Sequence, residues 1–169
     1  MIAAMFPGQG SQSIGMMADF YNTSAEVKNL FNEASSVLGY DLWKLIQFGS
    51  EEELNKTIYT QPAMLVSGVA AWSHFKLHFD TNINLMAGHS LGEYTALVCS
   101  GALKFSDAVY IVKSRAEYMQ NAVSENMGAM AAIIGLDDAA VVKLCTEAEE
   151  NDVVSAANYN APNQVVIAG

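Results

Sequence analysis

Positive charge and cysteine are both scarce in this sequence. Its 169 residues contain 8 Lys+Arg against 18 Asp+Glu, which gives a formal net charge of −10 at pH 7. Because few positive charges are available to bind phosphate backbones, we expect no nucleic-acid partner. The two cysteines, Cys99 and Cys145, show no CxxC spacing. This pattern argues against a disulfide framework and favours a reducing cytoplasm.

Long apolar runs are missing as well. None is long enough to span a membrane, and the first ten residues, MIAAMFPGQG, lack the basic lead of a signal peptide. We therefore expect no membrane association and a cytoplasmic location. Apolar residues are nevertheless abundant, at 51% of the chain, which is enough for the core of one domain or slightly more.

The first part of the chain alternates short strands with helices. Ile2 to Phe6 is expected to be a strand buried on both faces, and Ile83 to Ala87 a second one. The expected helices are one opened by a Thr23–Glu26 capping box and closed by Gly39, short pieces between Asp41 and Asn55, one from Gln61-Pro62 to about Phe79, one from Glu93 to Ser100, and one capped by Ser106-Asp107.

The pattern of expected strands and helices changes after Gly128. The expected elements are a strand over Ala129–Ile134, a helix over Asp137–Glu150, and strands over Val153–Ala157 and Gln164–Ala168. We predict an α/β body with a hydrolase-like parallel sheet over residues 1–126, and a smaller ferredoxin-like α+β subdomain, βαββ, over 127–169. Both units are expected to be incomplete, since a ferredoxin-like unit needs a further helix and strand.

A candidate nucleophile lies between the second strand and the next helix. Gly88-x-Ser90-x-Gly92 is typical of a nucleophile elbow, in which flanking glycines allow a sharp, tightly packed turn. Free N–H groups at the helix start favour developing negative charge, and the Leu91 N–H is the expected first oxyanion donor. The alternative is a tight strand-to-helix turn with a capping serine.

The loop after the first strand, Phe6-Pro7-Gly8-Gln9-Gly10-Ser11-Gln12, could instead bind a dinucleotide. It fails the GxGxxG fingerprint because Ser13 stands where glycine is needed. Since the carboxyl ends of parallel strands meet at one edge of a sheet, this loop is expected beside the elbow. Gln9 would then be the second oxyanion donor.

Arg115 is the only arginine, and it shares a helical face with Val112 and Met119. A guanidinium on an apolar face needs a carboxylate, supplied either by an internal Asp or Glu or by a ligand. The residue alone leaves both alternatives open.

No histidine qualifies as the general base that a serine nucleophile needs. His89 is adjacent to Ser90, and neighbouring side chains diverge on a tight turn. His74 and His78 are four residues apart, but no HExxH glutamate or third ligand accompanies them, so we expect a solvent-facing pair and no metal site.

Four segments together resemble bacterial malonyl-CoA:acyl carrier protein transacylases: the Phe6–Gln12 loop, Thr60-Gln61-Pro62-Ala63, Gly88-His89-Ser90-Leu91-Gly92-Glu93-Tyr94 and Gly128-Ala129-Met130-Ala131-Ala132. The resemblance spans the whole chain. It implies transfer of a malonyl group from malonyl-CoA, through an acyl-enzyme on Ser90, to the phosphopantetheine thiol of acyl carrier protein in fatty acid biosynthesis. No protein-bound cofactor is implied.

The resemblance also implies residue roles. Gln9 and the Leu91 N–H would form the oxyanion hole, and Arg115 would hold the malonyl carboxylate. Gln61, Asn158 and Asn160 fall in family motifs near the site. Family members continue past Gly169 and carry their catalytic histidine there, so this chain is expected to be an N-terminal portion.

Three alternatives remain open at this point. A polyketide-type acyltransferase would share these motifs. A serine thioesterase or lipase shares the elbow but does not need the arginine. A noncatalytic fragment that binds an acyl group or a carrier is favoured by the missing base.

Overall fold

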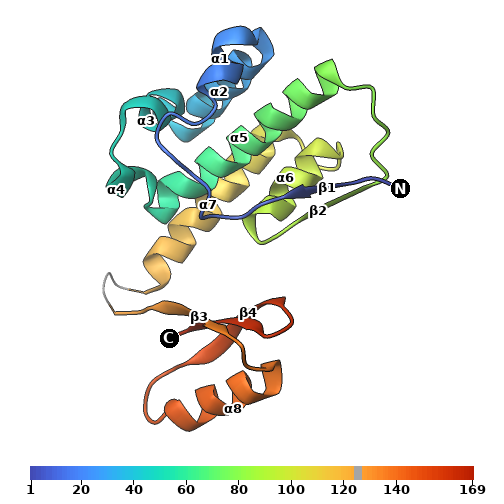
Figure 1. The fold of residues 1–169 in the computed structure, drawn as a ribbon. Coiled ribbons are helices and arrows are strands. Elements are labelled where there is room, and N and C mark those ends of the chain that lie inside the picture. Colours follow the sequence, from blue (N-terminus) through green and yellow to red (C-terminus); the bar gives the residue numbers. More distant parts are fainter. Residues whose placement is uncertain (124–126) are drawn as a thin grey trace. The chain divides into compact units, whose positions relative to one another are not determined.

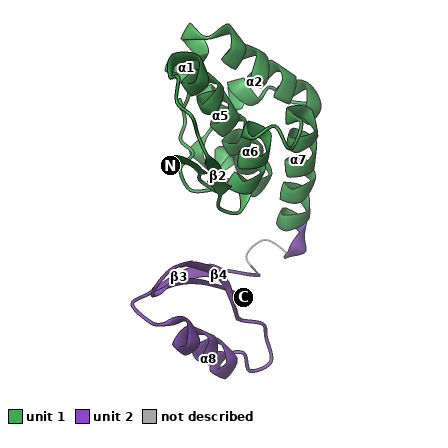
Figure 2. Cartoon of the chain, turned by 90° about the vertical axis from the view of Figure 1, so that its right-hand side faces the viewer, with its two compact units in different colours: residues 1–120 green, residues 121–169 purple. Residues whose placement is uncertain are grey.

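The computed structural model describes residues 1–123 and 127–169, and it divides the chain into two compact units, Met1–Gln120 and Asn121–Gly169 (Figure 2). The predicted boundary after Asn126 lies outside the described residues. None of the helices within residues 1–123 and 127–169 combines the length and the hydropathy that a membrane span requires.

Two parallel strands and a set of helices make up the first unit (Figure 1). Strands β1 (Ala3–Phe6) and β2 (Leu85–Gly88) pair in register from Ala3↔Leu85 to Phe6↔Gly88. The helices are α1 (Ala18–Thr23), α2 (Ala25–Leu38), α3 (Leu42–Phe48), α4 (Glu51–Leu54), α5 (Thr57–His78), α6 (Leu91–Cys99) and α7 (Phe105–Ala122). Helix α6 packs against both strands and against α5.

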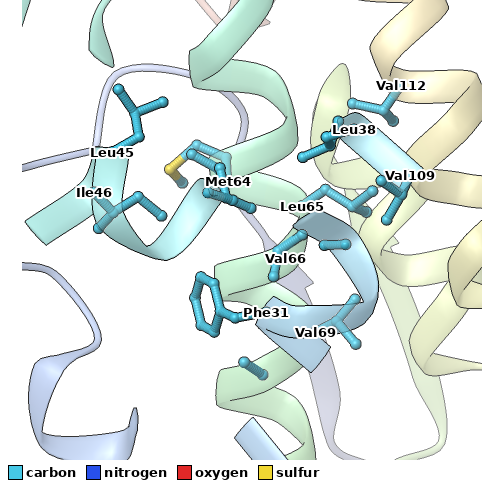
Figure 3. Close-up of a cluster of buried hydrophobic side chains, with 14 of the residues drawn as sticks. Phe31, Leu38, Leu45, Ile46, Met64, Leu65, Val66, Val69, Val109 and Val112 are labelled. Atoms are coloured by element: carbon cyan, nitrogen blue, oxygen red, sulfur yellow. The ribbon is translucent and has the colours of Figure 1, made fainter. Parts of the chain in front are cut away.

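The core of this unit is built around α5, which is apolar over most of its middle. Met64, Leu65, Val66 and Val69 of α5 are buried. Figure 3 shows them among side chains from α2, α3 and α7: Phe31, Leu38, Leu45, Ile46, Val109 and Val112. Burying this many aliphatic and aromatic side chains is the main stabilising contribution to such a fold.

The predicted double burial of the first strand is wrong for the described residues. Both strands alternate between exposed and half-buried positions, with Met5 and Leu85 among the exposed apolar side chains. The reason is that the described sheet has two strands, so only the side that meets α6 is covered.

Several helix starts also differ from the predictions. Helix α6 begins at Leu91 instead of Glu93, and α7 begins at Phe105, so the predicted cap Ser106-Asp107 lies inside it. Thr23 is the last residue of α1, and its hydroxyl donates to the Asp19 carbonyl, whereas Ser24 caps α2 by accepting from the Val27 N–H at 3.3 Å. Helix α5 begins at Thr57, so Pro62 stands inside it. Pro62 therefore correctly indicated a helix in this region, but the helix begins five residues before it.

The second unit has a three-stranded antiparallel sheet of order β3-β5-β4. Its elements are β3 (Met130–Ile134), α8 (Asp138–Ala148), β4 (Ser155–Ala161) and β5 (Gln164–Ala168), in the predicted βαββ order. Val141 and Cys145 of α8 pack on Val165 in the central strand. Asp137 caps α8 by accepting from the Ala140 N–H at 2.8 Å.

Candidate active site

Ser90 occupies a sharp turn between β2 and α6. Its backbone has φ 53° and ψ −109°, a conformation that a non-glycine residue rarely adopts and that is often found at functional sites. The two flanking glycines make the turn possible, because a Cβ on Gly88 would overlap backbone atoms of Gly92 and Glu93. The predicted elbow geometry is therefore present, and Ser90 stands directly before the first turn of α6.

The end of β1 packs directly onto this elbow. The His89 N–H donates to the Phe6 carbonyl at 3.2 Å, and a Cβ on Gly92 would overlap the carbonyl groups of Phe6 and Pro7. In the loop that follows, a Cβ on Gly8 would lie 3.9 Å from the Ser90 Cβ. The loop thus lies beside the elbow, as predicted from the sheet edge.

The predicted oxyanion donors have different surroundings. The Leu91 N–H is the first of α6, and the first N–H groups of a helix have no acceptor within the helix. The Gln9 side chain is exposed, and its Nε2 donates to Thr57 Oγ1 at 3.4 Å. The Leu91 N–H therefore lies next to Ser90 at the start of α6, whereas the Gln9 amide points toward the start of α5.

Arg115 reaches Ser90 from α7. Its Nη2 donates to Ser90 Oγ at 2.9 Å, and its Cζ lies 5.8 Å from the centroid of the Tyr94 ring, within the range of a cation–π interaction. Within residues 1–123 and 127–169, no carboxylate forms an ion pair with this guanidinium, the single ion pair there being Lys143–Glu147. An internal carboxylate partner is thus not observed for Arg115 in the described ranges.

Gln61 is the second partner of Arg115. It is fully buried on α5, and its Oε1 accepts a hydrogen bond from Arg115 Nη1 while its Nε2 donates to Met119 Sδ at 3.2 Å. In the sequence, only the family motif Thr60-Gln61-Pro62-Ala63 indicates a role for Gln61. Tyr94 was missed as a partner of Arg115, although its position four residues after Ser90 places it one helical turn from the elbow.

The three histidines lie in different settings. His89 is exposed, and the hydrogen bonds of the described residues give Ser90 Oγ no imidazole partner. The prediction of a solvent-facing pair is wrong for His74, which is half-buried. Its ring centroid lies 4.6 Å from that of Phe20, and its Nδ1 has no hydrogen-bond partner in the described ranges. His78 is exposed.

Asn158 and Asn160, also named by the family motifs, lie on β4 of the second unit. Asn158 faces Val166 in the β4–β5 register. The two described ranges contain no group of three or more His, Cys, Asp or Glu side chains that could bind a metal ion.

A strained serine between two close-packed glycines, with an arginine hydrogen-bonded to its hydroxyl, is the arrangement expected of a nucleophilic serine. The chain belongs to the acyl transferase domain family, whose model matches residues 5–169. Within that family it is similar to the malonyl CoA-acyl carrier protein transacylase of Escherichia coli O157:H7, with 56% identity over 167 residues that cover 99% of this chain and 54% of the relative.

Solved structures agree. The malonyl CoA-acyl carrier protein transacylase of Coxiella burnetii superposes with a TM-score of 0.95 and 48% identity, covering 99% of this chain and 53% of that one. A malonyl-transacylase in complex with a type II polyketide synthase acyl-carrier protein gives a TM-score of 0.93 and 52% identity, covering 99% and 54%. These matches confirm the predicted α/β fold class with its ferredoxin-like unit. The chain spans about half the length of these relatives.

Proposed function

We propose that the protein carrying this chain transfers malonyl groups from malonyl-CoA to acyl carrier protein in fatty acid biosynthesis. The observation that carries the proposal is the hydrogen bond from Arg115 to Ser90, made by a guanidinium without a carboxylate partner in the described residues. The names of the relatives above and the carrier-bound malonyl-transacylase support the same substrate and partner.

In the first half-reaction, Ser90 Oγ attacks the thioester carbonyl carbon of malonyl-CoA. The Oγ–C bond forms, the C–S bond breaks, and the serine proton passes through a general base to the departing CoA sulfur. The family resemblance assigns that base to a histidine beyond Gly169. In the second half-reaction the carrier's phosphopantetheine thiol attacks the acyl-serine carbonyl: the C–S bond forms, the C–Oγ bond breaks, and the thiol proton passes through the same base to Ser90 Oγ.

The elbow supports the charged intermediate of each half-reaction. We propose that the Leu91 N–H, the first of α6, donates to the oxyanion; each such donor is typically worth about 3 kcal/mol in the transition state. We propose Gln9 as the second donor. In this role its amide would exchange the 3.4 Å hydrogen bond to Thr57 for one to the oxyanion.

Arg115 is the proposed reader of the free carboxylate. The carboxylate carbon of a malonyl group on Ser90 lies two C–C bonds from the ester carbonyl, roughly 3–4 Å from Oγ. Arg115 Nη2 is 2.9 Å from the same Oγ, so a guanidinium at this place is within reach of that carboxylate. An acetyl group has no carboxylate to offer. We infer a cytosolic setting, since Cys99 and Cys145 are both free thiols and disulfides are rare in reducing compartments.

The test is to incubate the protein, at its natural length, with malonyl-CoA and to map the modified peptide by mass spectrometry. We expect a malonyl adduct on Ser90 that disappears when phosphopantetheinylated acyl carrier protein is added, and none in a Ser90→Ala variant. Release of free malonate at the same rate without the carrier would indicate a thioesterase instead. A protein that forms no adduct would be a noncatalytic binder.

A further inference from the structure

Gln61 is the residue that the proposed reaction leaves unexplained. It is one of few polar side chains buried in the first unit, and it is fully buried on the largely apolar helix α5. A buried amide costs free energy unless its donors and acceptor are satisfied. We propose that Gln61 is a positioning residue that fixes the Arg115 guanidinium with a neutral acceptor, so that Arg115 keeps its full charge for the acyl carboxylate. This inference rests on the proposed function.

The two partners of Gln61 determine which way its amide points. Arg115 can only donate hydrogen bonds, and the thioether sulfur of Met119 can only accept them. Because both lie on α7, four residues apart, the amide must turn Oε1 to Arg115 and Nε2 to Met119, as observed. Reversing the amide would set N–H groups against the guanidinium and an oxygen against the sulfur. The buried orientation of Gln61 is therefore fixed by its neighbours.

Within residues 1–123 and 127–169, the groups that contact the guanidinium are uncharged. Gln61 Oε1 accepts from Nη1, Ser90 Oγ accepts from Nη2, and the Tyr94 ring lies 5.8 Å away. These three contacts hold the guanidinium in one place without neutralising it. A carboxylate at position 61 would hold it equally well in geometry, but it would form a charge-assisted pair that competes with the substrate's carboxylate.

The decisive variant is Gln61→Glu, which keeps the size of the side chain and adds the competing charge. We measure kcat and KM for malonyl-CoA and for acetyl-CoA in the protein at its natural length. For Gln61→Glu we expect the malonyl-over-acetyl ratio of kcat/KM to fall by about tenfold or more, mainly through a higher KM for malonyl-CoA. The acetyl-CoA parameters should change little, because acetyl does not use the Arg115 charge.

Two further variants separate positioning from a purely structural role. Gln61→Met replaces the amide oxygen with the weaker acceptor of a thioether and adds no charge, so the ratio should fall by less than in Gln61→Glu. Gln47→Glu is the matched control, because Gln47 is a part-buried glutamine of the same unit whose Nε2 donates to the Met16 carbonyl at 2.9 Å. It should leave the ratio unchanged. If Gln61→Glu fails to fold, Gln61→Met still tests the proposal through its ratio.

The outcomes distinguish this inference from the proposed function. A ratio within about twofold of wild type in both Gln61 variants, or equal losses for the two substrates, would overturn the positioning role. If Arg115→Ala lowers the ratio while the Gln61 variants do not, only the inference about Gln61 fails. If Arg115→Ala also leaves the ratio unchanged, the assignment of Arg115 to the carboxylate fails.

Discussion

Replacing Gly92 with alanine should disable the elbow while leaving most of the helical core in place. A Cβ at this position would lie closer than 3.0 Å to three backbone atoms, the carbonyl carbon and oxygen of Phe6 and the carbonyl oxygen of Pro7. No rotamer change can relieve these contacts, because all three atoms belong to the main chain at the end of β1. The end of β1 and α6 must therefore move apart.

The size of the effect follows from that geometry. Ordinary carbon contacts are about 3.5 Å or longer, so the end of β1 has to shift by roughly 1 Å. Overpacking usually costs about 1–3 kcal/mol, and we expect about 3 kcal/mol here because backbone has to yield. The same shift would draw the Phe6–Gln12 loop away from Ser90 and disturb the hydrogen bond from the His89 N–H to the Phe6 carbonyl.

The assay combines urea unfolding, followed by fluorescence of Trp43 and Trp72 in the first unit, with the extent of Ser90 acylation by malonyl-CoA. Gly39→Ala is the control, because Gly39 has φ 84° and a Cβ there meets nothing within 4 Å. It should cost about 1 kcal/mol through backbone strain alone and leave acylation intact. If Gly92→Ala costs no more than this control and is acylated as fast as wild type, the packing argument for the elbow is wrong.

Two further predictions concern partly buried side chains away from Ser90. Burial raises the pKa of the Cys99 thiol to about 12, so iodoacetamide at pH 8 should alkylate it roughly a thousandfold more slowly than an ordinary thiol; rapid labelling of the folded protein, seen by mass spectrometry, would contradict this. Tyr40→Phe removes a buried hydroxyl that has no partner in the described ranges, so the free energy of unfolding should rise by about 1 kcal/mol in urea titrations. Burial, reinforced by Tyr59, raises the pKa of Tyr40, so above about pH 10 the unfolded chain loses the phenol proton while the folded protein keeps it. The free energy of unfolding of the wild type should therefore fall more steeply above pH 10 than that of Tyr40→Phe. Parallel pH curves for the two proteins would count against this reasoning.

The sequence predicted the parts of the site that are local in the chain. Gly88-x-Ser90-x-Gly92 carries its own geometric requirement, since the turn needs two residues without a Cβ, and the structure has that turn. The βαββ order after Gly128 was likewise predicted from short-range patterns. Local propensity and turn chemistry are enough for such elements.

Long-range contacts were beyond that reasoning. Gln61 and Arg115 are 54 positions apart, and nothing in either segment specifies that one amide oxygen meets the guanidinium. Burial of β1 was overestimated because an apolar run indicates a buried strand only if other elements cover both faces, which depends on the whole sheet. The orientation of Gln9 toward Thr57 depends on the loop conformation, which its residue types leave open.

The most direct test of the central claim is the selectivity of the protein at its natural length with Arg115 replaced by alanine. A charge-assisted pair between the guanidinium and the acyl carboxylate contributes about 1.5–3 kcal/mol, which corresponds to a preference of about 10- to 150-fold. We predict that Arg115→Ala loses that factor in the malonyl-over-acetyl ratio of kcat/KM while Ser90 still becomes acylated. An unchanged ratio would contradict the proposal that Arg115 reads the carboxylate.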